Sequence, residues 1–101
     1  MNLLKSHFKI SRMRVAFLAG FYEGEGHICK TASNSVQICI SQNCKYLLYE
    51  LKRVFGGKIT TGGSSPSFKW YRYGEPAKMI ASLFYPHLSP RRKKQMRKAL
   101  H

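Results

Sequence analysis

The stretch that most constrains the fold of this chain is residues 18–26, which read LAGFYEGEG. The apolar and small residues that lead into it are typical of a packed helix, and Gly24 and Gly26 favour the end of that helix and a sharp exit into a strand. Glu23 and Glu25 would then lie at the helix C-terminus, where the backbone dipole already places partial negative charge. We therefore expect a cation beside them, and a divalent metal ion is the natural candidate.

These two glutamates are half of the acidic residues in the chain. The 101 residues include 18 Lys and Arg but only four acidic residues, which gives a formal net charge of +14. A charge of this sign and size attracts polyanions, and by charge alone nucleic acid is the first candidate partner and an anionic membrane surface the second. A chain of this length forms one small domain, and association of two copies would improve the burial of its core.

The cysteines and the apolar segments indicate a protein of the cell interior. Cys29, Cys39 and Cys44 match neither a disulfide framework nor paired zinc ligands, which indicates reduced thiols. The apolar run at residues 15–21 follows basic residues as in a secretory signal, but it is short and Glu23 follows at once. No stretch reaches the length of a membrane span. We expect no membrane partner, and a cytoplasmic or organellar location (mitochondrion or chloroplast) rather than secretion.

Capping residues and apolar periodicity predict four helices after a lead-in at residues 1–11. The predicted helices are one over residues 12–24 capped by Ser11, one capped by Asn43 and ended by Gly56, one opened by residues 74–76 and closed by Pro86, and a basic last helix capped by Ser89.

Alternating apolar and polar residues predict two hairpins between these helices. The first joins a strand through Ile28 to one over residues 36–41, and the second joins residues 58–61 to 67–73 through a turn at 62–66. The chain is therefore predicted to be an α+β domain of order αββαββα, in which a four-stranded antiparallel sheet carries helices on one face. Its other face would be open and polar, and available to the edges of bases.

The strand at residues 67–73 is ambiguous. Alternation puts Phe68, Trp70 and Arg72 on one face and Lys69, Tyr71 and Tyr73 on the other, and the pattern alone does not tell which face is buried. Core packing and base stacking on single strands both suit these aromatic residues.

The motif at residues 18–26, together with the strand that begins at His27 and Ile28, resembles the LAGLIDADG homing endonuclease family. Residues 85–88, which read YPHL and precede a basic run, resemble the Pro-Tyr-Leu segment of that family. The resemblance implies a saddle-shaped sheet on the DNA major groove, with the motif helices of two domains packed together. Because residues 12–101 hold a single copy of the motif, it implies a homodimer on a near-palindromic site, with contacts at Phe17, Gly20, Glu23 and Gly24.

The resemblance also implies the metal site. In the family the last acid of the motif, here Glu25 beside Gly24, binds the metal, while the first, here Glu23, is structural. Residues two apart on a helix point about 200° away from one another, so the second carboxylate must come from the partner chain. The expected cofactor is Mg²⁺ or Mn²⁺, with no organic cofactor. The catalytic residues implied are Glu25, Gln42 and Arg91, with Lys45 and Lys93 as neighbours that share the role.

The predicted function is site-specific cleavage of double-stranded DNA, as in the homing of introns, by metal-dependent hydrolysis of one phosphodiester on each strand. An inactive DNA- or RNA-binding module on the same scaffold, a transcription factor or maturase, is the alternative, because both motif acids are Glu where Asp is commoner. A third interpretation, a basic ribosomal or RNA-binding protein, is supported by the net charge alone. The predicted DNA contacts are His27, Cys29, Thr31, Ser33, Gln37, Cys39, Ser41, Lys58, Thr60, Lys69, Arg72, Arg92 and Lys94.

Overall fold

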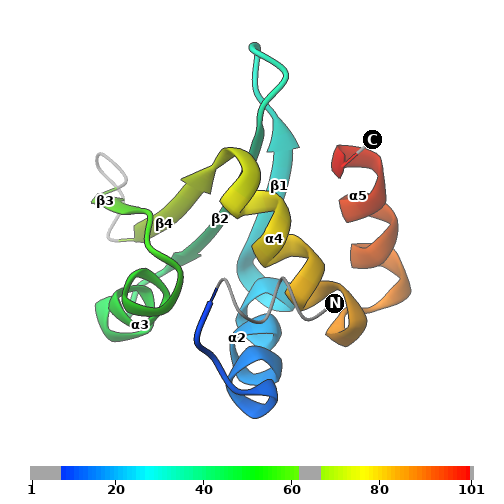
Figure 1. Cartoon of the computed structure of the whole chain (residues 1–101). Helices are drawn as coiled ribbons and strands as arrows, with labels where there is room; N and C mark the ends of the chain where they lie inside the picture. Colours follow the sequence, from blue (N-terminus) through cyan, green and yellow to red (C-terminus); the bar gives the residue numbers. More distant parts are fainter. Residues whose placement is uncertain (1–7, 62–66, 101) are drawn as a thin grey trace.

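The structure, a computed structural model, describes residues 8–61 and 67–100, so the predicted turn at 62–66 and most of the lead-in lie outside the described residues. The elements run in the predicted order of helices and hairpins (Figure 1). They are α2 (Arg12–Glu25), β1 (Gly26–Lys30), β2 (Val36–Gln42), α3 (Lys45–Phe55), β3 (Lys58–Thr61), β4 (Phe68–Tyr73), α4 (Gly74–Phe84), the short 3-10 helix η1 (Tyr85–His87) and α5 (Pro90–Leu100).

The four strands form one antiparallel sheet in the order β1-β2-β4-β3. Helices α2, α3 and α4 pack against this sheet, and α5 lies beside its edge strand β1 (Figure 1). The predicted α+β class and the four-stranded antiparallel sheet are confirmed. Within the described residues, no helix is both long enough and apolar enough to cross a membrane.

Helix α2 begins as predicted and ends one residue later. The Ser11 Oγ accepts a hydrogen bond from the backbone N–H of Arg14 at 3.1 Å, which confirms the predicted cap. The helix continues through Gly24 to Glu25, and Gly26 is already the first residue of β1. A Cβ at Gly26 would collide with the ring of Tyr22, so only glycine fits this joint.

Helix α3 begins differently from the prediction and ends as predicted. Its N-cap is Cys44 without a side-chain hydrogen bond, so the expected cap at Asn43 is wrong. The Asn43 Oδ1 instead accepts a hydrogen bond from the Ser67 Oγ at 2.9 Å, beside β4. Gly56 ends the helix with a φ of 76°, a conformation that favours glycine.

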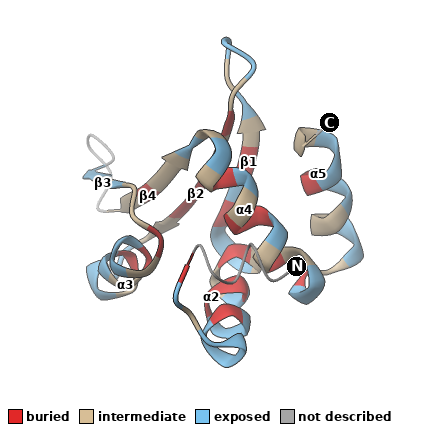
Figure 2. Ribbon diagram, viewed as in Figure 1, coloured by how far each residue is buried: buried red, intermediate tan, exposed pale blue. Residues whose placement is uncertain are grey.

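The strand register shows which face of the sheet carries the core. Ile40 lies opposite Trp70, and both side chains are fully buried. Figure 2 shows buried residues in red on the strands and on the helices α2 and α4. The Trp70 Nε1 donates a hydrogen bond to the backbone oxygen of Gly56 at 2.7 Å. Phe68, Trp70 and Arg72 therefore face the helices, and the other side chains of β4 face away from them.

Candidate nucleic-acid interface and acidic centre

Glu23 binds the beginning of α5 with both carboxylate oxygens. Its Oε1 accepts a hydrogen bond from the backbone N–H of Ser89 at 2.8 Å, and its Oε2 accepts one from the Ser89 Oγ at 2.7 Å. The carboxylate thus lies at a helix N-terminus, where negative charge is favourable. These two hydrogen bonds lower the pKa of Glu23.

Arg92 supplies a cation at the C-terminal end of α2. Its Nε donates to the backbone oxygen of Glu23 at 2.9 Å, its Nη1 donates to that of Gly26 at 3.0 Å, and its guanidinium lies over the ring of Tyr22. Arg92 is therefore a cation at this helix end that belongs to the chain itself, whereas the sequence suggested a divalent metal ion as the candidate. Arg92, which was predicted to contact DNA, is held here by protein carbonyls.

Glu25 differs from the other glutamates. Its side chain is exposed and, within the described residues, forms no hydrogen bond or ion pair. By contrast, Glu50 pairs with Arg14 and Arg53, and Glu75 pairs with Lys78. Of the two motif acids, Glu25 is thus the one whose carboxylate has no partner among the described residues and could bind a metal ion.

The predicted catalytic residues gather at the end of the sheet where α2 ends. Gly26, which follows Glu25, pairs with Ile40, and Gln42 is the last residue of the same strand β2. The contact between Glu23 and Ser89 brings the first turn of α5, with Arg91, to this end as well.

The two neighbouring lysines are engaged with aromatic rings. The Lys45 Nζ lies 4.7 Å from the ring centroid of Phe68, and the Lys93 Nζ lies 5.4 Å from that of Tyr85. In the part of the chain that the structure describes, no three metal-ligating side chains of His, Cys, Asp or Glu come together. The described side chains of one copy therefore do not form a metal site by themselves.

One side of α2 is unpacked. Met13 is 83% exposed, Phe17 is 51% exposed, and a Cβ at Gly20 or Gly24 would meet nothing within 4 Å. Spacings of four, three and four residues place these positions on one face of the helix, which we call the outer stripe (Met13, Phe17, Gly20 and Gly24). Bulky apolar groups beside glycines on an exposed face suit close packing against another helix.

The strand register places three rows of side chains on the sheet face that points away from the helices. We call this surface the open face, and its rows are Cys29, Gln37 and Tyr73; His27, Cys39, Tyr71 and Lys58; and Ser41, Lys69 and Thr60. Most of the predicted DNA contacts are members of these rows, but Cys39 among them is buried, which does not suit a DNA contact. Thr31 and Ser33 lie in the turn between β1 and β2, and Lys94 is exposed on α5.

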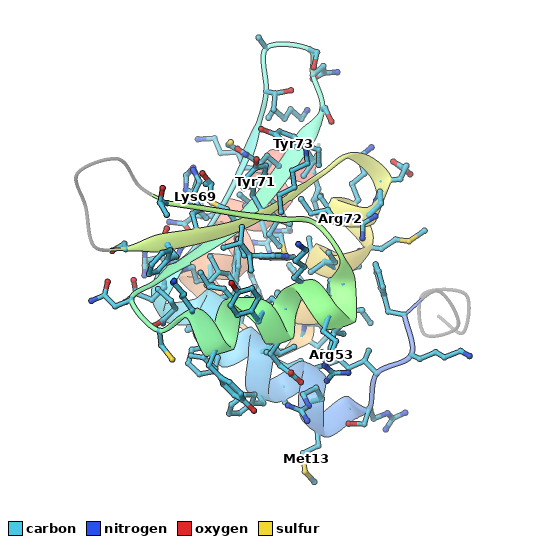
Figure 3. All side chains as sticks on the ribbon, turned by 90° about the vertical axis from the view of Figure 1, so that its left-hand side faces the viewer. Met13, Arg53, Lys69, Tyr71, Arg72 and Tyr73 are labelled. Carbon is cyan, nitrogen blue, oxygen red and sulfur yellow. The ribbon has the colours of Figure 1, made fainter. Side chains whose placement is uncertain are left out.

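Arg72 is an exception among the predicted contacts. Its guanidinium donates to the backbone oxygen of Phe55 on the helix side of the sheet. Figure 3 shows Lys69 and Tyr71 on the other side of β4 from Arg72. The structure therefore gives no support to the prediction that Arg72 contacts DNA.

A basic groove runs between β1 and α5. It is a hollow of about 410 Å³, and the residues that line it include His27, Lys30, Gln95 and Lys98. Among the described residues, no carboxylate forms an ion pair with a cation of α5. The exposed charges on this helix are thus available to phosphate groups.

Sequence reasoning missed several residues of this region. Lys30 and Lys98 belong to the groove, and Ser89 is the partner of Glu23. Tyr71 and Tyr73, for which the sequence left core packing and base stacking both open, belong to the open face. Strand alternation already grouped the two tyrosines with Lys69, and assigning Trp70 to the core would have placed all three on the open face. No local signal linked Ser89 to Glu23.

Comparisons with known proteins concern the fold of the chain. Residues 12–58 match the family model described as a LAGLIDADG-like domain. No curated protein matches the chain.

The fold is that of known homing endonucleases. The structure resembles the homing endonuclease I-CvuI in complex with its target in the presence of Ca, with a TM-score of 0.70 and 16% identity over 85% of this chain. It matches equally well a complex of I-CvuI with the I-CreI target in the presence of Mg, in which the DNA is not cleaved. The chain spans 62% of the length of I-CvuI. The homing endonuclease I-TnaI gives a TM-score of 0.68 with 18% identity, over 85% of this chain and 68% of that one.

Proposed function

Because the chain carries a LAGLIDADG-like domain over residues 12–58 on the fold of homing endonucleases, we propose that it is a site-specific DNA endonuclease that acts as a homodimer with a divalent metal ion. One observation carries the proposal. Helix α2 has an unpacked outer stripe and ends in Glu25, whose exposed carboxylate is unpaired within the described residues and directly precedes strand β1 of the sheet in a very basic chain.

The outer stripe supports the dimer. If the stripes of two copies pack together, Gly20 and Gly24 allow the two helix backbones to approach closely, while Met13 and Phe17 lose their contact with water. Each copy ends its helix in Glu25, so the same packing brings two unpaired carboxylates near the two-fold axis. In the described part of each chain Glu25 is the one glutamate without a partner, so a second copy would supply the second carboxylate.

The donor atoms suit a hard cation. Magnesium prefers oxygen ligands, uses few carboxylates and keeps several waters, so two Glu25 carboxylates, the Gly24 carbonyl oxygens and DNA phosphates form a fitting donor set. When bound, such an ion lowers the pKa of an attacking water and polarises the phosphate. Gln42 would orient the water, and Arg91 would hold the scissile phosphate, because both lie at the sheet end that carries Glu25.

The open face and the basic groove support DNA binding. The open face offers small polar side chains such as Gln37 and Ser41 to base edges, and the groove beside it offers cations to the backbone. The homing endonuclease I-CvuI, which shares this fold, forms complexes with target DNA.

The test begins by selecting cleaved sites from a randomised DNA library with Mg²⁺ present. The chain should cut a near-palindromic target on both strands. Glu25→Gln should abolish cleavage and leave binding of that target intact, since the Glu25 side chain is exposed and supports no other contact in the described residues.

Glu75→Gln is the matched control, because it removes the same charge from an exposed position on α4 and should cut normally. Unchanged cleavage by Glu25→Gln would disprove the role of this carboxylate. Tight binding without cleavage in Mg²⁺ and Mn²⁺ by the natural chain would favour the DNA- or RNA-binding module instead.

A further inference from the structure

Two tyrosines stand side by side on the open face. Tyr71 and Tyr73 alternate along β4, an inner strand of the sheet, and their ring centroids are 5.6 Å apart with the ring planes at 80°. The Tyr73 side chain is half exposed, whereas the Trp70 side chain on the same strand is fully buried in the core. We call this pair the tyrosine platform (Tyr71 and Tyr73).

The platform is held in place and borders a hollow. The Tyr73 hydroxyl accepts a hydrogen bond from the Gln37 Nε2 at 3.0 Å, and the Gln37 Oε1 lies 3.7 Å from the Cys29 Sγ, which donates to it. This chain of contacts joins three strands and fixes the ring of Tyr73. A hollow of about 350 Å³ beside the platform is lined by Gly57, Lys58, Tyr71, Arg72 and Tyr73.

Cations lie next to the rings. Lys58 is directly opposite Tyr71 in the strand register, and Lys69 precedes Tyr71 by two residues on the same face. The rings offer contact to a base, and these two ammonium groups offer contact to the phosphates on either side of it.

We propose that the tyrosine platform binds unpaired nucleotides, so that the open face also takes up single-stranded nucleic acid. A base inside a duplex presents only its edge to a protein in the groove, and its faces are covered by its neighbours. An aromatic ring can stack on a base only when the base is unstacked, and four-stranded sheets of RNA-binding domains use aromatic side chains in this way. This activity goes beyond DNA cleavage and needs neither Glu25 nor a metal ion.

The experiment measures fluorescence anisotropy of labelled oligonucleotides of one sequence as single-stranded DNA, single-stranded RNA and duplex DNA, without metal. The double variant Tyr71→Leu with Tyr73→Leu should lose about 10-fold or more of its affinity for single strands, and far less for duplex. The variant with Phe at both positions should keep its affinity, because the rings remain. The two single-strand arms report whether DNA or RNA is preferred.

A double variant on α3, Tyr46→Leu with Tyr49→Leu, is the matched control, because these tyrosines are 74% and 57% exposed on an element that lies off the open face. It should bind single strands as the natural chain does. Equal losses on duplex and single strands would overturn the proposal and assign the platform to groove contacts. Unchanged binding of single strands by the platform variant would overturn it as well.

A second measurement uses the natural chain. Photocrosslinking to an oligonucleotide that contains 5-iodouracil should attach it at Tyr71 or Tyr73, as mapped by mass spectrometry. Crosslinks confined to other residues would contradict the proposal even if the leucine variant failed to fold.

Discussion

Glu23 and Ser89, 66 residues apart in sequence, form two hydrogen bonds that join the end of α2 to the beginning of α5. Arg92 closes the same junction from the other side by donating to the backbone oxygens of Glu23 and Gly26. The position of Glu25 relative to Arg91 therefore depends on contacts in which neither of these two side chains takes part.

Glu23→Gln should destabilise the chain at neutral pH by about 1 kcal/mol, because the charge-assisted hydrogen bonds to Ser89 are weakened at a partly exposed site. The pKa of Glu23 is lowered from 4.5 by these bonds, so the stabilisation is present above pH 4.5 and is lost as the pH falls through the folded-state pKa. Urea unfolding at neutral pH and in strong acid should show a difference between natural chain and variant that shrinks on acidification. A difference that stays constant would refute this assignment.

Arg92→Ala should cost about 2 kcal/mol of stability, because it removes a cation that donates to two backbone oxygens at the end of α2. Arg92→Lys should recover only part of the loss, since an ammonium group lacks the forked geometry of the guanidinium. Thermal unfolding measures the effect, and Lys94→Ala, at an exposed position of the same helix, is the control. If both alanine variants melt alike, the junction contributes nothing to stability.

Gly20→Arg should convert the proposed dimer into a folded monomer that no longer cuts DNA. The side chain has room in the isolated chain, since a Cβ at Gly20 meets nothing within 4 Å, but at the dimer axis it would bring together two like charges and block close packing. Analytical ultracentrifugation gives the mass, and circular dichroism checks the fold. Ser82→Arg, at an exposed position of α4, should leave the mass unchanged. A Gly20→Arg protein that sediments as a dimer would argue against the outer stripe as the interface.

The elements of the fold were predictable where the signals are local. Ser11 and Gly56 mark helix ends through contacts or φ angles that belong to their immediate neighbours. Asn43 failed as a cap because its side chain bonds Ser67, which is 24 residues away. The buried face of β4 could not be predicted either, because it too is set by contacts with residues that are distant in sequence. Its assignment follows from the pairing of Trp70 with Ile40 and from the Trp70 hydrogen bond to Gly56.

The acidic centre was predictable only in part. The spacing of Glu23 and Glu25 on a helix predicted that their side chains point in different directions. In the structure Glu23 is bonded to Ser89, whereas Glu25 is exposed. The sequence did not predict which cation binds the backbone oxygens at the end of α2, because the last helix carries several Arg and Lys residues in similar local sequence. The selection of Arg92 follows from how α5 packs beside β1, which is a long-range property of the fold.

Helix α2 ends at Glu25 and strand β1 begins at Gly26, so no linker residue separates the two elements. One inserted residue would turn the carboxylate about 100° around the helix axis or slip the strand so that its inward side chains face outward. If the chain cleaves DNA as proposed, the spacing between the broken bond and the bases that are read is therefore built into the backbone. Such an enzyme can change its target by exchanging side chains on the strands, but it cannot move its cut.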